Sequence, residues 1–179
     1  MIKTLAALSL GLASSTAYAS TGSIHFYGQV HAGTCQVVII DPENGNPINR
    51  IGLGNVSAAE FKQIDDESGA RSFGMRVVPG SGCILLPNAN ASVTFIGGYG
   101  NAGASGALYA LQPGGAKGLA LVIKDDAGSV VEPGVTSKQY ALGVGTPKDM
   151  LFSAALRATA ATVSPGPATT DLRFSVDIH

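Results

Sequence analysis

The chain has 179 residues, of which 11 are basic and 12 are acidic, so its formal net charge at pH 7 is −1. This near-neutral balance, without a basic patch, argues against nucleic acid or anionic lipid as a partner. Beyond the N-terminus no run reaches the roughly 18 apolar residues of a membrane helix, so we expect no membrane insertion. The length fits one domain with a sizeable hydrophobic core.

The N-terminus has the layout of a secretory signal peptide. Lys3 provides a positive charge, an apolar run extends from Leu5 to Ala13, and Ala17-Tyr18-Ala19 forms a small-x-small cleavage site. A single-pass anchor is the alternative, but the apolar run is too short to cross a bilayer. We expect residues 1–19 to be removed after Ala19, with Ser15 as an alternative cleavage position, and the mature protein to be exported.

The mature chain starts with an alternating pattern. Ile24, Phe26, Gly28 and Val30 fall on one side of an extended segment, and mostly polar residues fall on the other. A period of two is typical of a half-buried β-strand. Taken alone, the pattern also fits an ordinary first strand that pairs within its own domain.

Two cysteines follow, Cys35 and Cys83. In an exported protein this even count favours one disulfide. Closing a loop of this length stabilises the folded state by roughly 4 kcal/mol in the chain-entropy model. A metal or redox pair is the alternative, but the sequence has no Cys-x-x-Cys motif and no histidines at ligand spacing near these residues.

The rest of the chain consists of short apolar runs separated by turn residues. Only the stretch from Ala58 to Ile64 suggests a short helix. Turns or loops are expected at Asp41–Pro47, Gly97–Gly106 and Asp125–Ser129. The expected strands are Cys35–Ile40, Ile51–Leu53, Ser72–Val78, Val93–Gly97, Leu119–Ile123, Val130–Val131 and Met150–Thr159. Many short strands with frequent turns predict an antiparallel β-sandwich.

The C-terminus carries a second alternating pattern. Leu172, Phe174, Val176 and Ile178 alternate with polar residues up to the terminal His179. Chain ends fray unless something holds them. A patterned strand at each end of the mature chain therefore indicates that both are used for pairing.

No constellation of residues predicts catalysis. His25, His31 and His179 are scattered, without an acid or nucleophile at a useful spacing. The run Asp65-Asp66-Glu67 suggests a cation site, but it lacks ligand spacing and is more typical of a solvated turn. We therefore expect no enzyme activity, no metal and no cofactor.

Several segments, in this order, form a recognisable set: Gly22–Val30 ahead of Cys35, Phe73–Val77 with Cys83, Val93–Gly97, Gly118–Ile123 with Asp126–Gly128, and Phe152–Leu156 with Pro165-Gly166 and Phe174–His179. The set resembles the pilin subunits of chaperone–usher fimbriae, the type 1 and P pilus family. It covers nearly the whole mature chain. Three features depart from the family: Ile178 stands where the family usually has Tyr, an apparent insertion extends from Asp41 to Arg50, and the extension ahead of Gly22 is very short if cleavage follows Ala19.

The resemblance implies an all-β fold, an incomplete immunoglobulin-like antiparallel sandwich completed by a donor strand from a neighbouring subunit. It divides the mature chain into a donor-strand extension at 20–30 and a pilin domain at 31–179. Within the extension, Ile24 and Phe26 would fill the groove of the neighbour and Gly22 would be the family's small donor residue. The implied donor-strand residues are Gly22, Ile24, Phe26, Gly28 and Val30. The implied groove wall, which also faces the chaperone, comprises Leu172, Phe174, Val176, Ile178 and His179, whose carboxylate would meet basic chaperone residues.

The implied function is that of a structural subunit of a surface fimbria used in adhesion or biofilm formation. Identical or related pilin subunits, a periplasmic chaperone and an outer-membrane usher are the implied partners, on a route through the periplasm to the cell surface. Two alternatives remain: a minor adaptor or terminator subunit, or a secreted, self-contained immunoglobulin-like binding module. A two-domain adhesin is disfavoured, because the mature chain leaves no room for a second domain.

Overall fold

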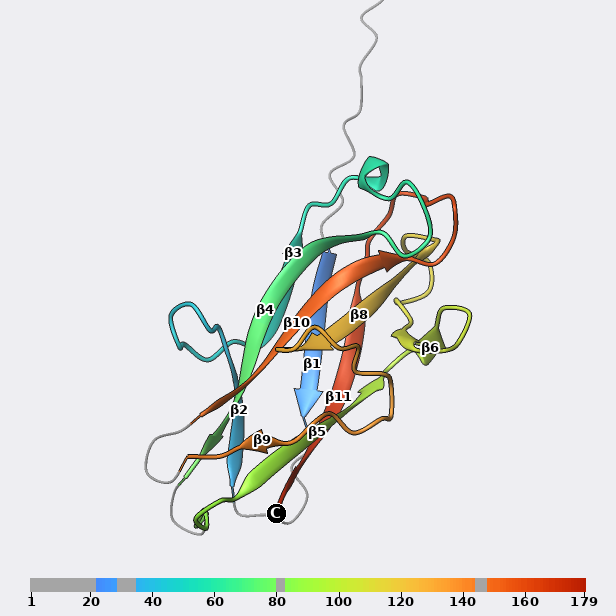
Figure 1. The fold of residues 1–179 in the computed structure, drawn as a ribbon. Helices are drawn as coiled ribbons and strands as arrows, with labels where there is room; N and C mark the ends of the chain where they lie inside the picture. The colour runs from blue at the N-terminus through green and yellow to red at the C-terminus, as the bar shows by residue number, and fades with distance from the viewer. Residues whose placement is uncertain (1–21, 29–34, 80–82, 144–147) are drawn as a thin grey trace, which may run out of the picture.

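The structure is a computed structural model that describes residues 22–28, 35–79, 83–143 and 148–179 (Figure 1). The predicted signal peptide, Val30 and His31 lie outside these residues. The described chain forms two facing β-sheets. Its elements are β1 (Gly22–Gly28), β2 (Gln36–Ile40), β3 (Arg50–Gly54), the 3-10 turn η1 (Ala58–Glu60), β4 (Glu67–Val78), β5 (Asn90–Gly97), β6 (Asn101–Ala102), β7 (Leu108–Tyr109), β8 (Leu119–Asp125), β9 (Tyr140–Ala141), β10 (Asp149–Ala158) and β11 (Thr170–Ile178).

The strand order is β3-β1-β11-β5-β9 in one sheet and β2-β4-β10-β8-β7-β6 in the other. Among the described strands every ladder is antiparallel except that between β1 and β11, which is parallel. The fold is therefore the antiparallel β-sandwich that the sequence predicts. In its five-stranded sheet, β1 of the same chain lies between β3 and β11 and pairs with both.

The core lies between the two sheets and is centred on an aromatic cluster. The ring of Phe152 on β10 lies 5.6 Å from Phe73 and 5.2 Å from Phe95, centroid to centroid, and the Tyr140 ring lies 5.3 Å away. The rings of Phe95 and Phe152 meet edge to face, an arrangement that aromatic quadrupoles favour. Phe73, Phe95 and Phe152 occupy inward positions of β4, β5 and β10, so the period of two in these strands contributes directly to the core.

Most strand predictions are confirmed: β2, β3, β5, β8, β10 and β11 occur where the alternating or continuous apolar runs place them. The helical turn or two predicted within Ala58–Ile64 occurs as the single turn η1, which ends at Glu60. Val130 forms a single bridge to Lys124 in place of the predicted strand. The two-residue strands β6, β7 and β9 are too short to produce a pattern, and β6 lies inside the segment expected to be a loop.

β4 begins five residues earlier than the sequence pattern suggests. Its first residues are polar and mostly half-buried or exposed, so they produce no apolar alternation. They form a strand because β10 lies beside them, with Glu67 opposite Arg157. Glu67 accepts hydrogen bonds from Arg157 Nε at 2.8 Å and from Lys124 Nζ at 2.7 Å. The prediction that Asp65-Asp66-Glu67 is only a solvated turn is therefore wrong for Glu67.

Candidate strand-binding groove

β3 and β11 form the two walls of a slot in the five-stranded sheet, which we call the strand-binding groove. On β3, Ile51 and Leu53 are buried while their neighbours along the strand are exposed. On β11, Thr170, Leu172 and Phe174 are buried. Both walls thus bury every second side chain, mostly an apolar one, and turn a backbone edge towards the space between them.

β1 occupies this groove and pairs with both walls (Figure 1). The register aligns Ile24 with Ile51 on one side and with Thr170 on the other. It aligns Phe26 with Leu172. The donor residues expected to fill a groove therefore share register positions with buried residues of the walls.

The two glycines of β1 lie at its ends. Gly28 is aligned with Phe174 of β11, and Gly22 with Gly54 of β3, next to an irregularity in that ladder. The fifth predicted donor residue, Val30, lies outside the described residues.

The second half of β11 differs from the first. Val176 is partly buried, and Ile178 is 37% exposed. These residues pair with β5, with Ile178 opposite Ala91. Reciprocal backbone hydrogen bonds between His179 and Asn90, of 3.0 and 2.7 Å, close the ladder. The alternating face predicted from Leu172 to Ile178 is therefore buried only as far as Phe174.

His179 is exposed at the end of β11. Its Nε2 atom lies 2.9 Å from the side-chain nitrogen of Gln139.

The cysteines are joined as predicted. Cys35, directly before β2, and Cys83, ahead of β5, form a disulfide with their Cα atoms 4.6 Å apart. The bridge connects the two sheets at the end of the sandwich where β2 and β5 begin and β11 ends. We call this the disulfide end, and the opposite end, which contains Gly54 and η1, the distal end.

Two groups of charged residues lie on the six-stranded sheet. Burial of the Glu67 carboxyl would raise its pKa, but hydrogen bonds from Lys124 and Arg157 outweigh it and the pKa is lowered. Arg76 on β4 makes a bidentate ion pair with Asp149 on β10, with N···O distances of 2.6 and 2.9 Å. Both interactions join strands of the six-stranded sheet. They stabilise the scaffold on the side of the sandwich opposite the groove.

Within the described part of the chain, no group of three or more His, Cys, Asp or Glu side chains gathers at a spacing that would hold a metal ion. In the same residues, no helix has the length and apolar character needed to span a bilayer. The geometry of the groove is suited to binding an extended segment.

The sequence identified β3 as a strand but not as a wall of the groove. The alternation of Ile51 and Leu53 with exposed residues was the available signal. It shows that one face is buried, but not which strand lies beside it.

Comparisons with known proteins agree with this architecture. The profile of the family described as Fimbrial protein matches residues 24–179. Long polar fimbria protein A of Salmonella typhimurium strain LT2 is 28% identical over 180 residues, which cover 98% of this chain and 96% of that protein. The crystal structure of an antigen and type I fimbria protein of Burkholderia pseudomallei superposes with a TM-score of 0.55 at 26% identity, covering 89% of this chain and 92% of the other.

A chain from the structure of a chaperone–usher pilus has the same fold, with a TM-score of 0.57 at 17% identity and coverage of 97% of this chain and 100% of the other. The family match covers every described strand, except that it begins after the first two residues of β1. The chain belongs to the fimbrial protein family and has the fold of chaperone–usher pilus subunits, which are structural proteins and not enzymes.

Proposed function

We propose that this protein polymerises into a surface fimbria by donating the segment Gly22–Val30 to the strand-binding groove of another copy. The observation that carries the proposal is the position of β1 between β3 and β11. Without β1, these two strands would have no partner on their facing edges in the described sheet.

A second copy offers the groove the same segment as its own β1. Backbone hydrogen bonds supply affinity and alternate side chains supply specificity, and the side chains of the two segments are identical. Burial of Ile24 and of Phe26 would each contribute about 1.5–3 kcal/mol. Exchange of an identical element between copies is a low-cost route to assembly.

An empty groove would be an aggregation hazard, because it exposes two unpaired strand edges beside an apolar face. This supports the need for a periplasmic chaperone that covers the groove, with β11 and the His179 carboxylate as its contact. An outer-membrane usher would then pass the subunits to the cell surface. Adhesion or biofilm formation would be the use of the fibre.

A second candidate is a self-contained immunoglobulin-like binding module. The pairing of β1 within its own chain favours it, because a closed module would have the same arrangement. The two candidates differ in whether β1 leaves the groove. A closed module refolds as a monomer and stays one, whereas a pilin forms ladders that resist mild denaturant because strand release is slow.

Deletion of residues 20–28 from the mature chain tests strand donation. We expect the truncated protein to form no polymer, because it has a groove but no strand to donate. It should still bind its chaperone, since the groove is intact. Gel filtration and denaturing gels of unboiled samples give the readout. Polymer formation by the truncated protein would show that another segment is the donor.

A peptide test uses the full chain, which avoids a variant that fails to fold. An excess of a synthetic peptide of residues 22–30 should occupy free grooves and stop the growth of polymers. A matched peptide with Phe26→Asp should leave growth unchanged, because a carboxylate cannot be buried beside Leu172 without a large cost. If polymers grew at the same rate with either peptide and without peptide, residues 22–30 would not be the donated segment.

A further inference from the structure

The disulfide end carries two unusually exposed aliphatic side chains. Ile84 is 85% exposed and Leu86 is 69% exposed, the highest values among the large hydrophobic residues of the described chain. Leu85, between them, is partly buried and packs against the core. This contact holds the segment after Cys83 in place while Ile84 and Leu86 remain exposed. A backbone hydrogen bond of 3.0 Å from Ala89 to Leu86 fixes the turn that follows. The two side chains therefore form an exposed apolar pair at this end of the sandwich.

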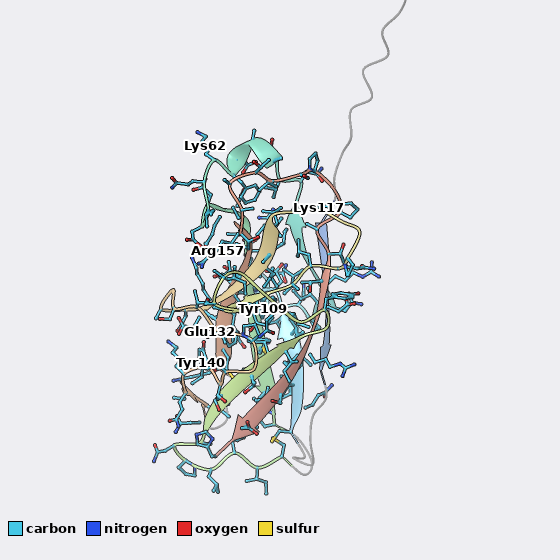
Figure 2. All side chains as sticks on the ribbon, turned by 90° about the vertical axis from the view of Figure 1, so that its right-hand side faces the viewer. Lys62, Tyr109, Lys117, Glu132, Tyr140 and Arg157 are labelled. Carbon is cyan, nitrogen blue, oxygen red and sulfur yellow. A yellow bond between two sulfur atoms is a disulfide. The ribbon has the colours of Figure 1, made fainter. Side chains whose placement is uncertain are left out.

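The distal end carries an apolar hollow of about 30 Å³. It lies where β3, β8 and β10 reach this end of the sandwich, below η1, and Lys62 and Lys117 mark the same end in Figure 2. Ile64, which is 54% exposed, follows Phe61 in the loop beside the hollow. Its lining includes the apolar side chains of Phe61, Leu119, Leu156 and Val163.

The topology decides which ends of two copies meet when a strand is donated. The donated segment precedes Cys35, so it leaves its own domain at the disulfide end. In its own chain β1 runs from Gly54 at the distal end towards the disulfide end, parallel to β11. If a donated strand ran in that direction, the disulfide ends of the donor and the acceptor would face each other. Such a contact uses the same end of both copies, so assembly would stop at a dimer.

A donated strand in the opposite direction would leave the groove at the distal end. The disulfide end of the donor would then face the distal end of the acceptor. This contact joins two different surfaces and leaves one of each free, so it can be repeated without limit. Growth into a fibre requires this second arrangement.

We propose that Ile84 and Leu86 of each copy pack against Ile64 and the apolar rim of the distal hollow of the copy that accepts its strand. The proposal rests on the strand donation proposed above and adds a second contact between the same two copies. The partner at the distal end is a second copy of this chain, because the donated strand keeps the disulfide end of its own copy close to the distal end of the acceptor. The contact is too small to bind alone, and it acts because the strand raises the effective concentration of the two surfaces.

A cysteine pair tests this contact. Ile64→Cys combined with Leu86→Cys should give covalent ladders on a non-reducing denaturing gel after assembly and mild oxidation. The matched control combines Leu86→Cys with Val135→Cys, since Val135 is similarly exposed at 52% but lies beside the middle of β5. We expect at least about tenfold more cross-linked product from the first pair. Equal yields from both pairs would overturn the end contact.

The variant Leu86→Asp provides a second measurement. The side chain is exposed in the monomer, so its unfolding midpoint should match the parent protein, which shows that it folds. Polymer growth should slow by roughly tenfold, the effect of losing one interface contact. If the parent protein forms no polymer at all, strand donation itself is wrong. If the parent polymerises and Leu86→Asp grows equally fast, the end contact is wrong while strand donation stands.

Discussion

At the scale of single residues, two buried tyrosines connect the core to its surroundings. Tyr109 is fully buried, and its hydroxyl donates a 2.9 Å hydrogen bond to the Val131 carbonyl. Tyr140 donates to the Leu151 carbonyl at 3.2 Å. Burial, with smaller contributions from nearby carboxylates, raises the pKa of both hydroxyls far above the ordinary value of 10.0.

These raised pKa values predict a loss of stability in alkaline solution. Tyrosines of the unfolded chain ionise near pH 10, whereas the folded chain keeps both protons at higher pH. The free energy of unfolding should therefore fall as pH rises above about 10, by up to about 1.4 kcal/mol per pH unit for each tyrosine. Denaturant titrations between about pH 9 and pH 11.5 measure the slope.

The variant Tyr109→Phe is the control for this effect. It should be less stable near neutral pH by about 1 kcal/mol, because the Val131 carbonyl loses its donor. Its stability should nevertheless fall less steeply above pH 10 than that of the parent protein. An unchanged slope would mean that Tyr109 does not govern the alkaline transition.

At the scale of elements, the disulfide connects the two sheets. It fixes the start of β2, in one sheet, to the segment that leads into β5, in the other. The same end of the sandwich holds the exposed pair Ile84 and Leu86. The bridge therefore stabilises the fold and also fixes the position of Ile84 and Leu86, which would form the proposed end contact.

Replacement of both cysteines, Cys35→Ala with Cys83→Ala, should lower the free energy of unfolding by roughly 4 kcal/mol through loop-closure entropy. Equilibrium unfolding in denaturant gives the value. Reductant should destabilise the parent protein by a similar amount and leave the double variant unchanged. A parent protein insensitive to reductant would show that the bridge contributes little.

At the scale of the whole molecule, β1 is the element whose partner can change. Within its own chain its described ladder on β11 ends at Phe174, and the pairing is parallel. A strand from another copy, inserted in the opposite direction, could pair with β11 as far as Ile178. Antiparallel pairing is also slightly more stable per residue than parallel pairing.

This difference predicts that the polymer resists denaturation better than the monomer. The guanidinium midpoint of purified polymer should exceed that of the monomer in the same buffer. Polymer of the Leu86→Asp variant, which lacks the end contact, should have a midpoint between these two values. Circular dichroism measures unfolding, and gel filtration confirms the starting species. Coincident midpoints would indicate that donated and resident strands pair equally well.

The patterns with the strongest local signal were predicted well. The alternation of Leu172 and Phe174 with polar residues identified β11, and the two cysteines of an exported chain identified the disulfide. The start of β4 was not predictable, since Glu67 belongs to a strand only because Arg157 and Lys124 lie across from it. The second wall of the groove, β3, was equally hidden, because no local pattern states which strands become neighbours.

The sequence by itself determined the sandwich, the disulfide and the two patterned terminal strands, because a period of two and a count of cysteines are local properties of the chain. Only the tertiary structure decided that β1 lies between β3 and β11, parallel to β11, and that Ile84 and Leu86 lie at the end opposite the apolar hollow. Such facts depend on contacts between residues far apart in the chain. Strand order and direction are set by packing of the whole sandwich, and no single segment encodes them.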